Sequence, residues 1–390
     1  MKFQGMIIGV PKEIMKAEYR VAATPDTVKK MIGEGAKVLV ETGAGAGAYF
    51  HDEQYMAVGA QMEPDVTKIF ALADVILKVK EPLFNEAVGK HEAEMVREGQ
   101  YLITFLHPAS PVNHGMIRQL AASGVTSLTL DGIPRITRAQ AMDALSSMST
   151  VAGYKGLLNA ATRLPKFMPM IGTAVGAIKP ANVLVIGAGV SGLQSIATAK
   201  RLGAVVTAVD IRPEAEEQAK SLSAKIHNVG IPAELAIGEG GYANSLSDEW
   251  LEKERESLKD LVKNSDIVVL SALIPGKQAP ILITEDMVKS MASGSCIVDI
   301  SIDQGGNCAC TPSGSVAVVH GVTIDGTKNI PGSVPTSSTW MFSQNIYNML
   351  AYLAKDGQIT LDRNDEIVAS SLTTINKEIV HAGTREAMGI

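Results

Sequence analysis

A glycine-rich turn between two apolar runs is the segment of this sequence best suited to bind a ligand. Residues 183–192 read VLVIGAGVSG, with turn glycines at Gly187, Gly189 and Gly192, and a second apolar run ends in Asp210. In a strand–turn–helix unit such glycines permit a tight bend, close approach of a pyrophosphate and packing of helix on strand. The helix N-terminus then offers unpaired N–H groups to phosphate. An acid at this spacing accepts both ribose hydroxyls and repels a 2′-phosphate, which predicts an NAD(H) site that disfavours NADP(H).

Four further polar side chains lie at or near the ends of predicted strands: Arg20, Lys80, His107 and Asp303. Ligands of open α/β sheets bind at such ends. A guanidinium can hold a carboxylate, an ammonium can polarise a carbonyl, an imidazole can carry a proton near neutral pH, and a carboxylate can orient water or ammonia. Each residue also has a structural interpretation: the arginine as an ion-pair partner, the lysine as a solvated edge residue, the histidine as a hydrogen-bonded strand end and the aspartate as a turn cap.

Composition argues against several other classes of protein. The 390 residues are 46% hydrophobic with a net charge of −6, which is typical of a globular protein of two domains and not of a nucleic-acid binder. No run approaches the ~18 apolar residues of a membrane span, and the N-terminal apolar run is too short for a signal peptide. Cys296, Cys308 and Cys310 form neither a disulfide framework nor a sufficient metal-ligand set. We therefore expect a cytoplasmic protein without a metal.

Two series of short apolar runs alternate with helical stretches. The first series lies within residues 6–130 and the second within 183–326. Such alternation predicts parallel sheets covered by helices on both faces. Helical stretches over 139–164 and 339–356 are expected to join the two halves of the fold.

The predicted fold class is therefore α/β, with two Rossmann-like doubly wound domains that are separated by a cleft and joined by long helices. The substrate domain is expected to be discontinuous, with residues 1–142 and 340–390. Residues 143–339 are expected to form the NAD(H)-binding domain.

Six segments resemble the family of alanine dehydrogenases and nicotinamide nucleotide transhydrogenases, and the resemblance covers essentially the whole chain. The segments are RVAATP (20–25), LKVKEP (77–82), PRITRAQ (134–140), SSMSTVAGY (146–154), ALIPG (272–276) and GGNC (305–308). The resemblance implies NAD(H) as the cofactor and hydride transfer as the activity.

Three features resemble the NAD(H)-binding domain of the proton-pumping transhydrogenase. They are the loop from Arg135 to Asp143, the GEGGYA segment (238–243) and the tail 365–381, which alanine dehydrogenases generally lack. The family resemblance implies that Arg135, Gln140, Asp143 and Ser146 hold the nicotinamide or a polar substrate side chain. It also implies that Leu273 packs near the nicotinamide ribose, with Ser149 close by.

The catalytic positions resemble the alanine dehydrogenases instead. Their arginine, lysine, histidine, aspartate and asparagine are matched by Arg20, Lys80, His107, Asp303 and Asn329. Phe105 and Met148 match residues that line the dehydrogenase substrate pocket. Transhydrogenase domains usually keep the arginine but have lost the lysine, histidine and aspartate.

The retained set favours an NAD-dependent amino-acid dehydrogenase of the alanine dehydrogenase type, because hydride transfer between two nicotinamides requires positioning but no acid, base or carboxylate clamp. In this interpretation Arg20 and Lys80 bind a small L-amino acid or its 2-oxo acid, His107 carries the proton and Asp303 orients ammonia. The pyrophosphate is assigned to the turn, including Val190.

The alternative is the NAD(H)-binding α subunit of a proton-translocating transhydrogenase, which passes hydride from NADH to NADP⁺. That subunit would be peripheral to the inner membrane and would need partner subunits for the channel and the NADP(H) site. A nucleotide-binding sensor without turnover is a third interpretation. Under the first two we expect a homodimer or a higher homo-oligomer.

Overall fold

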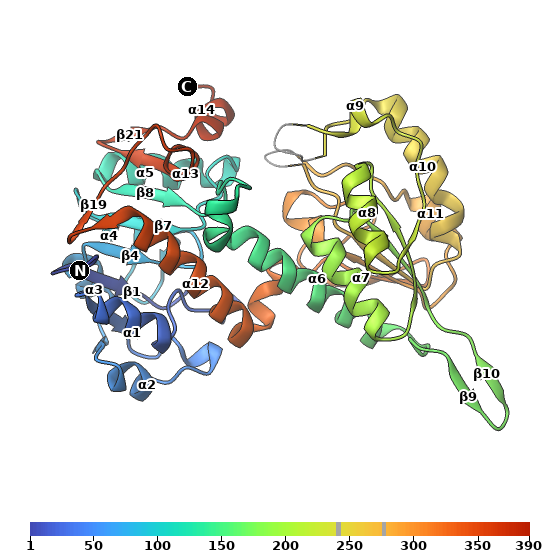
Figure 1. Cartoon of the computed structure of the whole chain (residues 1–390), viewed down its shortest axis with the longest axis horizontal. Helices are drawn as coiled ribbons and strands as arrows, with labels where there is room; N and C mark the ends of the chain where they lie inside the picture. The colour runs from blue at the N-terminus through green and yellow to red at the C-terminus, as the bar shows by residue number, and fades with distance from the viewer. Residues whose placement is uncertain (239–242, 275–277) are drawn as a thin grey trace. The chain divides into compact units, whose positions relative to one another are not determined.

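The computed structural model describes residues 1–238, 243–274 and 278–390, and its contacts divide the chain into two units. Unit 1 comprises Met1–Met148 and Gly332–Ile390, and unit 2 comprises Ser149–Pro331 (Figure 1). The divisions fall six residues after the first predicted boundary and eight before the second. Most of the GEGGYA segment and the end of the ALIPG segment lie outside the described residues.

Unit 1 is built on an eight-stranded sheet with the order β21-β20-β8-β7-β4-β1-β2-β3. The strands are β1 (Ile7–Val10), β2 (Lys37–Glu41), β3 (Gln61–Glu63), β4 (Val75–Leu77), β7 (Tyr101–Thr104), β8 (Thr126–Thr129), β20 (Leu372–Ile375) and β21 (Glu378–Ile379). Those from β1 to β8 run parallel, whereas β20 pairs antiparallel with β8 and β21 with β20. The C-terminal tail thus extends the sheet at one edge.

The helices of unit 1 connect and cover these strands (Figure 1). They are α1 (Pro25–Gly33), α2 (Asp52–Ala57), α3 (Val66–Leu72), α4 (Glu92–Met95), α5 (His114–Ser123), α12 (Pro335–Leu353), α13 (Glu366–Ser371) and α14 (Ala382–Met388). One core cluster joins Ile69 and Phe70 of α3, Ile117 and Leu120 of α5, and Leu102 of β7. Two short antiparallel pairs complete the unit: β5 (Phe84–Asn85) with β6 (Lys90–His91), and β18 (Ala354–Lys355) with β19 (Gln358–Ile359).

Unit 2 contains a seven-stranded sheet with the order β13-β12-β11-β14-β15-β17-β16. Its strands are β11 (Asn182–Ile186), β12 (Val205–Val209), β13 (Lys225–Ile226), β14 (Ile267–Leu270), β15 (Cys296–Asp299), β16 (Val316–Val319) and β17 (Val322–Asp325). All are parallel except β16, which pairs antiparallel with β17. The strand order reverses between β11 and β14, which is the point where doubly wound sheets bind ligands.

Helices cover both faces of the unit 2 sheet, which explains why β11 reads as an uninterrupted apolar run. Val183 and Val185 pack in one cluster with residues of α6 (Ala144–Arg163), α7 (Val190–Arg201) and α8 (Pro213–Ser221). Leu184 and Ile186 pack in another with residues of α10 (Asp248–Lys263) and α11 (Glu285–Ser290). The unit also contains α9 (Ala233–Ala236) and a hairpin of β9 (Ile171–Thr173) and β10 (Gly176–Ile178), which projects from the sheet (Figure 1).

The predicted α/β class is confirmed, and every apolar run of the two series forms a strand. The short strands β3, β13, β16, β20 and β21 were not predicted. They have two to four residues each. Sheet pairing rather than their own apolar pattern defines these strands.

Candidate functional site

The turn after β11 requires glycine at two positions. Gly187 has a φ of +89°, and a Cβ on Gly192 would lie 1.9 Å from the carbonyl oxygen of Gly187. The Gly187 N–H donates to the carbonyl of Val209 at 2.8 Å, which holds the turn against β12. Helix α7 begins at Val190, directly after Gly189 as its N-cap. The unpaired N–H groups of its first turn therefore lie at the switch point of the sheet.

A glycine of α6 allows the start of α7 to lie against that helix. A Cβ on Gly153 would lie 2.1 Å from the carbonyl oxygen of Ser191, so no side chain fits there. The Ser195 hydroxyl donates to the carbonyls of both Gly153 and Ser191 at 3.0 Å. This role of Gly153 was not predicted, although a glycine inside a predicted helix often has a packing function.

The first turn of α7 also contains a polar atom suited to a phosphate. Ser191 Oγ is buried and has no hydrogen-bond partner among the described residues. A hydroxyl beside a helix N-terminus can donate to a pyrophosphate oxygen. Together with the glycine turn, this atom shows that the residues present fit a dinucleotide.

Asp210 lies next to the turn, as the spacing predicts. Its Oδ2 accepts the N–H of Ala188 at 2.7 Å, which fixes the carboxylate beside the glycines. Arg212 also binds it, through Nε to Oδ1 at 2.9 Å and Nη2 to Oδ2 at 2.8 Å. Arg212 was not predicted as a site residue; its position two residues after Asp210 is the signal that could have indicated it.

The loop after β15 is held by two buried polar side chains, Asp299 and Asn307. Asp299 Oδ2 accepts the N–H groups of Asn307 at 2.8 Å and Cys308 at 3.1 Å. Burial raises the pKa of Asp299 despite these hydrogen bonds. The amide of Asn307 bonds to both the N–H (3.0 Å) and the carbonyl (2.9 Å) of Ala272, next to Leu273. The asparagine of the GGNC segment thus joins the loops that follow β14 and β15.

The predicted residues Asp303, Leu273 and Asn329 lie outside the strands and α-helices of unit 2. Asp303 is exposed within a 3-10 helix, Ile300–Gln304, and Leu273 is 37% exposed. Asn329 has a φ of +53°, a left-handed conformation that asparagine tolerates better than most residues. These side chains are exposed or half-buried, whereas the neighbouring Asp299 and Asn307 are fully buried.

His107 and Asp131 form an acid–imidazole pair at the ends of β7 and β8 in unit 1. His107 Nδ1 lies 2.7 Å from Asp131 Oδ1, and Asp131 Oδ2 accepts the N–H of His107 at 2.8 Å. Burial acts to lower the pKa of His107, but the charge and hydrogen bond of Asp131 raise it. Phe105 stacks on the imidazole with ring centroids 5.7 Å apart. Asp131 was not predicted as a site residue. Its carboxylate orients the imidazole and leaves Nε2 to exchange a proton.

Lys80 is positioned by a buried ionic cluster behind it. Glu13 accepts the backbone N–H of Val79 at 2.6 Å and that of Lys80 at 3.4 Å. The fully buried Lys78 ammonium pairs with Glu92 at 3.0 Å and with Glu13 at 3.4 Å. Burial, opposed by the Lys78 charge, raises the pKa of Glu13 to about 7. Lys78 is therefore structural. The charge of Lys80, by contrast, acts to lower the pKa of His107.

Arg20 is buried and held by an adjacent acid. Glu18 accepts from Nε at 2.8 Å and from Nη2 at 2.6 Å, and Nη1 contacts the sulfur of Met148 at 2.9 Å. The structure thus brings together Arg20 and Met148, two predicted substrate-binding residues. The paired face of the guanidinium, however, already binds a carboxylate from the chain itself.

The loop resembling that of transhydrogenases is tied to the C-terminal tail. It contains a 3-10 helix, Thr137–Met142, in which Arg138 pairs with Asp365 at 2.9 Å and with Glu366 at 3.1 Å. Asp143 accepts from the N–H and the hydroxyl of Ser146 at 2.8 and 2.6 Å, which fixes the start of α6. The side chains of Arg135 and Gln140 are exposed. These four nicotinamide candidates lie in unit 1, whereas Ser149 lies in unit 2.

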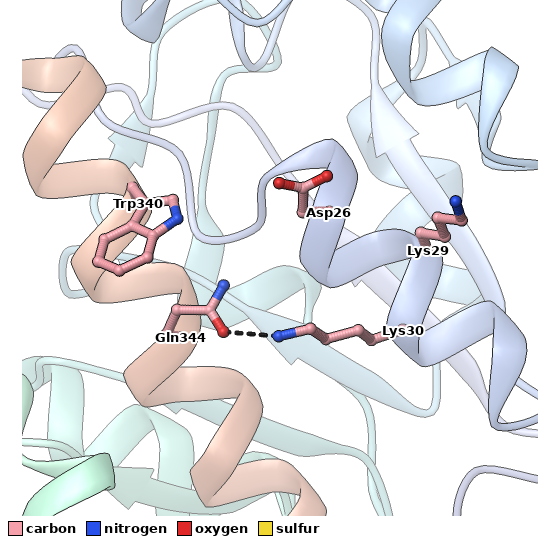
Figure 2. A pocket seen from close by; sticks show the side chains of 5 residues that line it. All are labelled: Asp26, Lys29, Lys30, Trp340 and Gln344. Atoms are coloured by element: carbon pink, nitrogen blue, oxygen red, sulfur yellow. Dashed lines mark hydrogen bonds between the residues drawn. The ribbon is translucent and has the colours of Figure 1, made fainter.

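A hollow on unit 1 between α1 and α12 contains none of the predicted site residues. Its lining comprises Asp26, Lys29, Lys30, Trp340 and Gln344 (Figure 2). Lys30 Nζ donates to Gln344 Oε1 at 2.8 Å, a contact that joins the two helices. Its arrangement indicates helix packing rather than chemistry.

Across the described ranges, no three histidine, cysteine or acidic side chains are grouped so as to hold a metal ion. In the same ranges, no helix has the length and apolar character needed to cross a bilayer.

Comparisons with known proteins cover nearly the whole chain. The family model "Alanine dehydrogenase/PNT, N-terminal domain" matches residues 9–152, and "Alanine dehydrogenase/PNT, C-terminal domain" matches 156–382. A protein of Rhodospirillum rubrum, named as the first portion of an NAD(P) transhydrogenase subunit alpha, is 41% identical over 96% of this chain and 98% of its own. An alanine dehydrogenase of Staphylococcus saprophyticus is 32% identical over 99% and 97%. The crystal structure of a transhydrogenase from Sinorhizobium meliloti superposes with a TM-score of 0.81, at 35% identity over 96% of this chain and 99% of that one.

Proposed function

Because the chain belongs to the alanine dehydrogenase/transhydrogenase family and is an NAD(H)-binding oxidoreductase, we propose that it is the NAD(H)-binding α component of an NAD(P) transhydrogenase. The observation that carries this choice is the 41% identity to a transhydrogenase subunit of nearly the same extent, against 32% for an alanine dehydrogenase. The catalytic positions favoured the amino-acid dehydrogenase over the transhydrogenase subunit, and this choice reverses that order.

The residues of unit 2 have defined tasks in this proposal. The turn from Gly187 to Gly192 and the N-terminus of α7, with Ser191 Oγ, bind the pyrophosphate, and Asp210 binds the adenosine ribose. When bound, NAD(H) supplies the hydride donor or acceptor. The protein supplies position, and Asn307 contributes by holding the backbone beside Leu273.

Partner subunits carry the NADP(H) site and the proton path in this proposal, so the chain is peripheral to their membrane. We also propose that it forms a homodimer. The β9–β10 hairpin and the segment just before it contain exposed apolar side chains. Phe167, Met170 and Val175 are 55%, 68% and 98% exposed. These three side chains lie close together along the chain, and exposed apolar surface favours association with protein.

A second candidate function is supported by the His107–Asp131 pair. An imidazole held by a carboxylate, with the Lys80 ammonium in electrostatic range, is suited to proton transfer during oxidation of an amino acid to a 2-oxo acid. Direct hydride transfer between nicotinamides needs no such group. The occupied face of Arg20 weighs against this candidate, because a substrate carboxylate would compete with Glu18.

Isotope transfer distinguishes the two candidates. The purified chain is mixed with membranes containing partner subunits from the same genome, with NADPH deuterated at the reactive C4 position and with NAD⁺. Deuterium in the NADH, detected by mass spectrometry only when both components are present, is the result we expect. A genome without such partner genes, or no transfer with both components present, would contradict the proposal.

The same chain alone, with NAD⁺ and a panel of L-amino acids, tests the second candidate. We expect no NADH. Formation of NADH that His107→Asn abolishes, while NADH affinity stays within about threefold, would establish a dehydrogenase instead. Asp356→Asn, an exposed position in unit 1, serves as the matched control.

A further inference from the structure

The Asp210 carboxylate already has four hydrogen bonds within unit 2. Oδ2 accepts from Ala188 N and Arg212 Nη2, and Oδ1 accepts from the backbone N and Nε of Arg212, all between 2.7 and 2.9 Å. Its four lone-pair positions are therefore used. The side chains of Asp210 and Arg212 are only 4% and 16% exposed, respectively. A ribose diol needs the same two oxygens, so ribose binding requires exchange of the guanidinium contacts.

Arg212 remains near the site when that exchange occurs. Its backbone N–H is bonded to Asp210, and α8 begins at the next residue, so its Cα is fixed. Nη2 lies 3.9 Å from the position that a Cβ on Gly189 would occupy, beside the turn expected to bind the pyrophosphate. A guanidinium released from the acid at this corner is within side-chain reach of the ribose, and guanidinium groups bind phosphate with two parallel hydrogen bonds.

The pair also changes the electrostatic reason for rejecting NADP(H). An unpaired aspartate repels a 2′-phosphate, whereas an aspartate bound to an arginine has no net charge. The second residue of the pair is moreover the residue type that recognises phosphate. The prediction from Asp210 alone, that NADP(H) is disfavoured, therefore omits an opposing cation.

We propose that Arg212 determines how strongly this site distinguishes NAD(H) from NADP(H): it competes with the ribose of both nucleotides for Asp210 and supplies a cation to the 2′-phosphate of one. The proposal rests on the dinucleotide site of unit 2, but not on the choice between transhydrogenase and dehydrogenase. Binding is measured without a hydride acceptor, so failure of either function leaves the test intact.

The experiment measures the Kd of the full chain for NADH and for NADPH by nucleotide fluorescence, in wild type and in Arg212→Ala. Loss of one charged hydrogen-bonding partner predicts a Kd for NADPH that rises roughly 10–100-fold. The Kd for NADH should stay equal or fall, because a competitor is removed. The ratio of the two constants thus increases at least tenfold.

Two further variants make the outcome decisive. Arg212→Gln gives the same test with a smaller change in packing, should the alanine variant fold poorly by circular dichroism. Arg201→Ala removes an exposed arginine from the last turn of α7 and should leave both constants unchanged. A ratio that stays constant or falls, or parallel weakening of both nucleotides, would overturn the proposal. Wild-type protein that binds neither nucleotide would instead refute the dinucleotide site itself.

Discussion

Replacement of Asp131 by asparagine tests whether the acid–imidazole pair of unit 1 is a genuine ionic contact. Burial acts to raise the pKa of Asp131, but the His107 charge and hydrogen bonds lower it from 3.8 to about 2. That difference corresponds to ~2 kcal/mol of folding free energy. Because the folded-state pKa is depressed, this stabilisation is present above pH ~4 and is lost as the pH falls through ~2.

The same contact also weakens at high pH, because His107 then loses its charge. Its folded-state pKa is raised above 6.5, so the contribution of imidazolium is complete below that value and is lost as the pH rises through the folded pKa. Asp131→Asn should therefore reduce the free energy of unfolding by ~2 kcal/mol between pH 4 and 6.5, and by less at higher or lower pH. The variant should also lower the pKa of His107.

Urea denaturation across this pH range measures the stability, and NMR titration of the imidazole Cε1–H resonance measures the pKa. Asp356→Asn should change unit 1 stability by less than ~0.5 kcal/mol, since the side chain is exposed. A His107 pKa that is the same in Asp131→Asn and wild type would refute the reasoning, because the carboxylate would then not interact with the ring.

Three other perturbations have defined outcomes. Burial, followed by the Asp210 charge, raises the pKa of Glu254 from 4.5 to about 7, so the free energy of unfolding falls as the pH rises from 4.5 through 7. Glu254→Gln should remove this pH dependence and increase the free energy of unfolding by up to ~3 kcal/mol at pH 8, as measured by urea denaturation. Gly153→Ala should destabilise unit 2 by ~1–3 kcal/mol and weaken NADH binding in fluorescence titration, and unchanged affinity would show that α7 does not depend on that contact. Lys78→Met should cost ~3–5 kcal/mol by leaving its two glutamates unpaired, and a thermal midpoint equal to that of wild type would contradict the buried cluster.

Much of the fold could be predicted from local patterns along the chain. A run such as 183–186 must be buried on both sides, because four consecutive apolar residues cannot all face one core from a strand. The turn after it was identified for an equally local reason: Gly187 has a positive φ, and a Cβ on Gly192 would meet the carbonyl of Gly187 within the same turn. The short edge strands β20 and β21 could not be found in this way, because a strand of two to four residues is stabilised mainly by its neighbour in the sheet.

The candidate site also has features that local sequence predicts and others that only tertiary contacts decide. The sequence by itself determined which residue types stand at strand ends, including Lys80, His107 and Asp210, because each follows an apolar run at a readable spacing. Only the tertiary structure decided which charges those residues meet: Asp131 for the imidazole of His107 and Arg212 for the carboxylate of Asp210. The physical reason is that ion pairing depends on distances of about 3 Å between side-chain atoms, and chain spacing alone does not specify such distances.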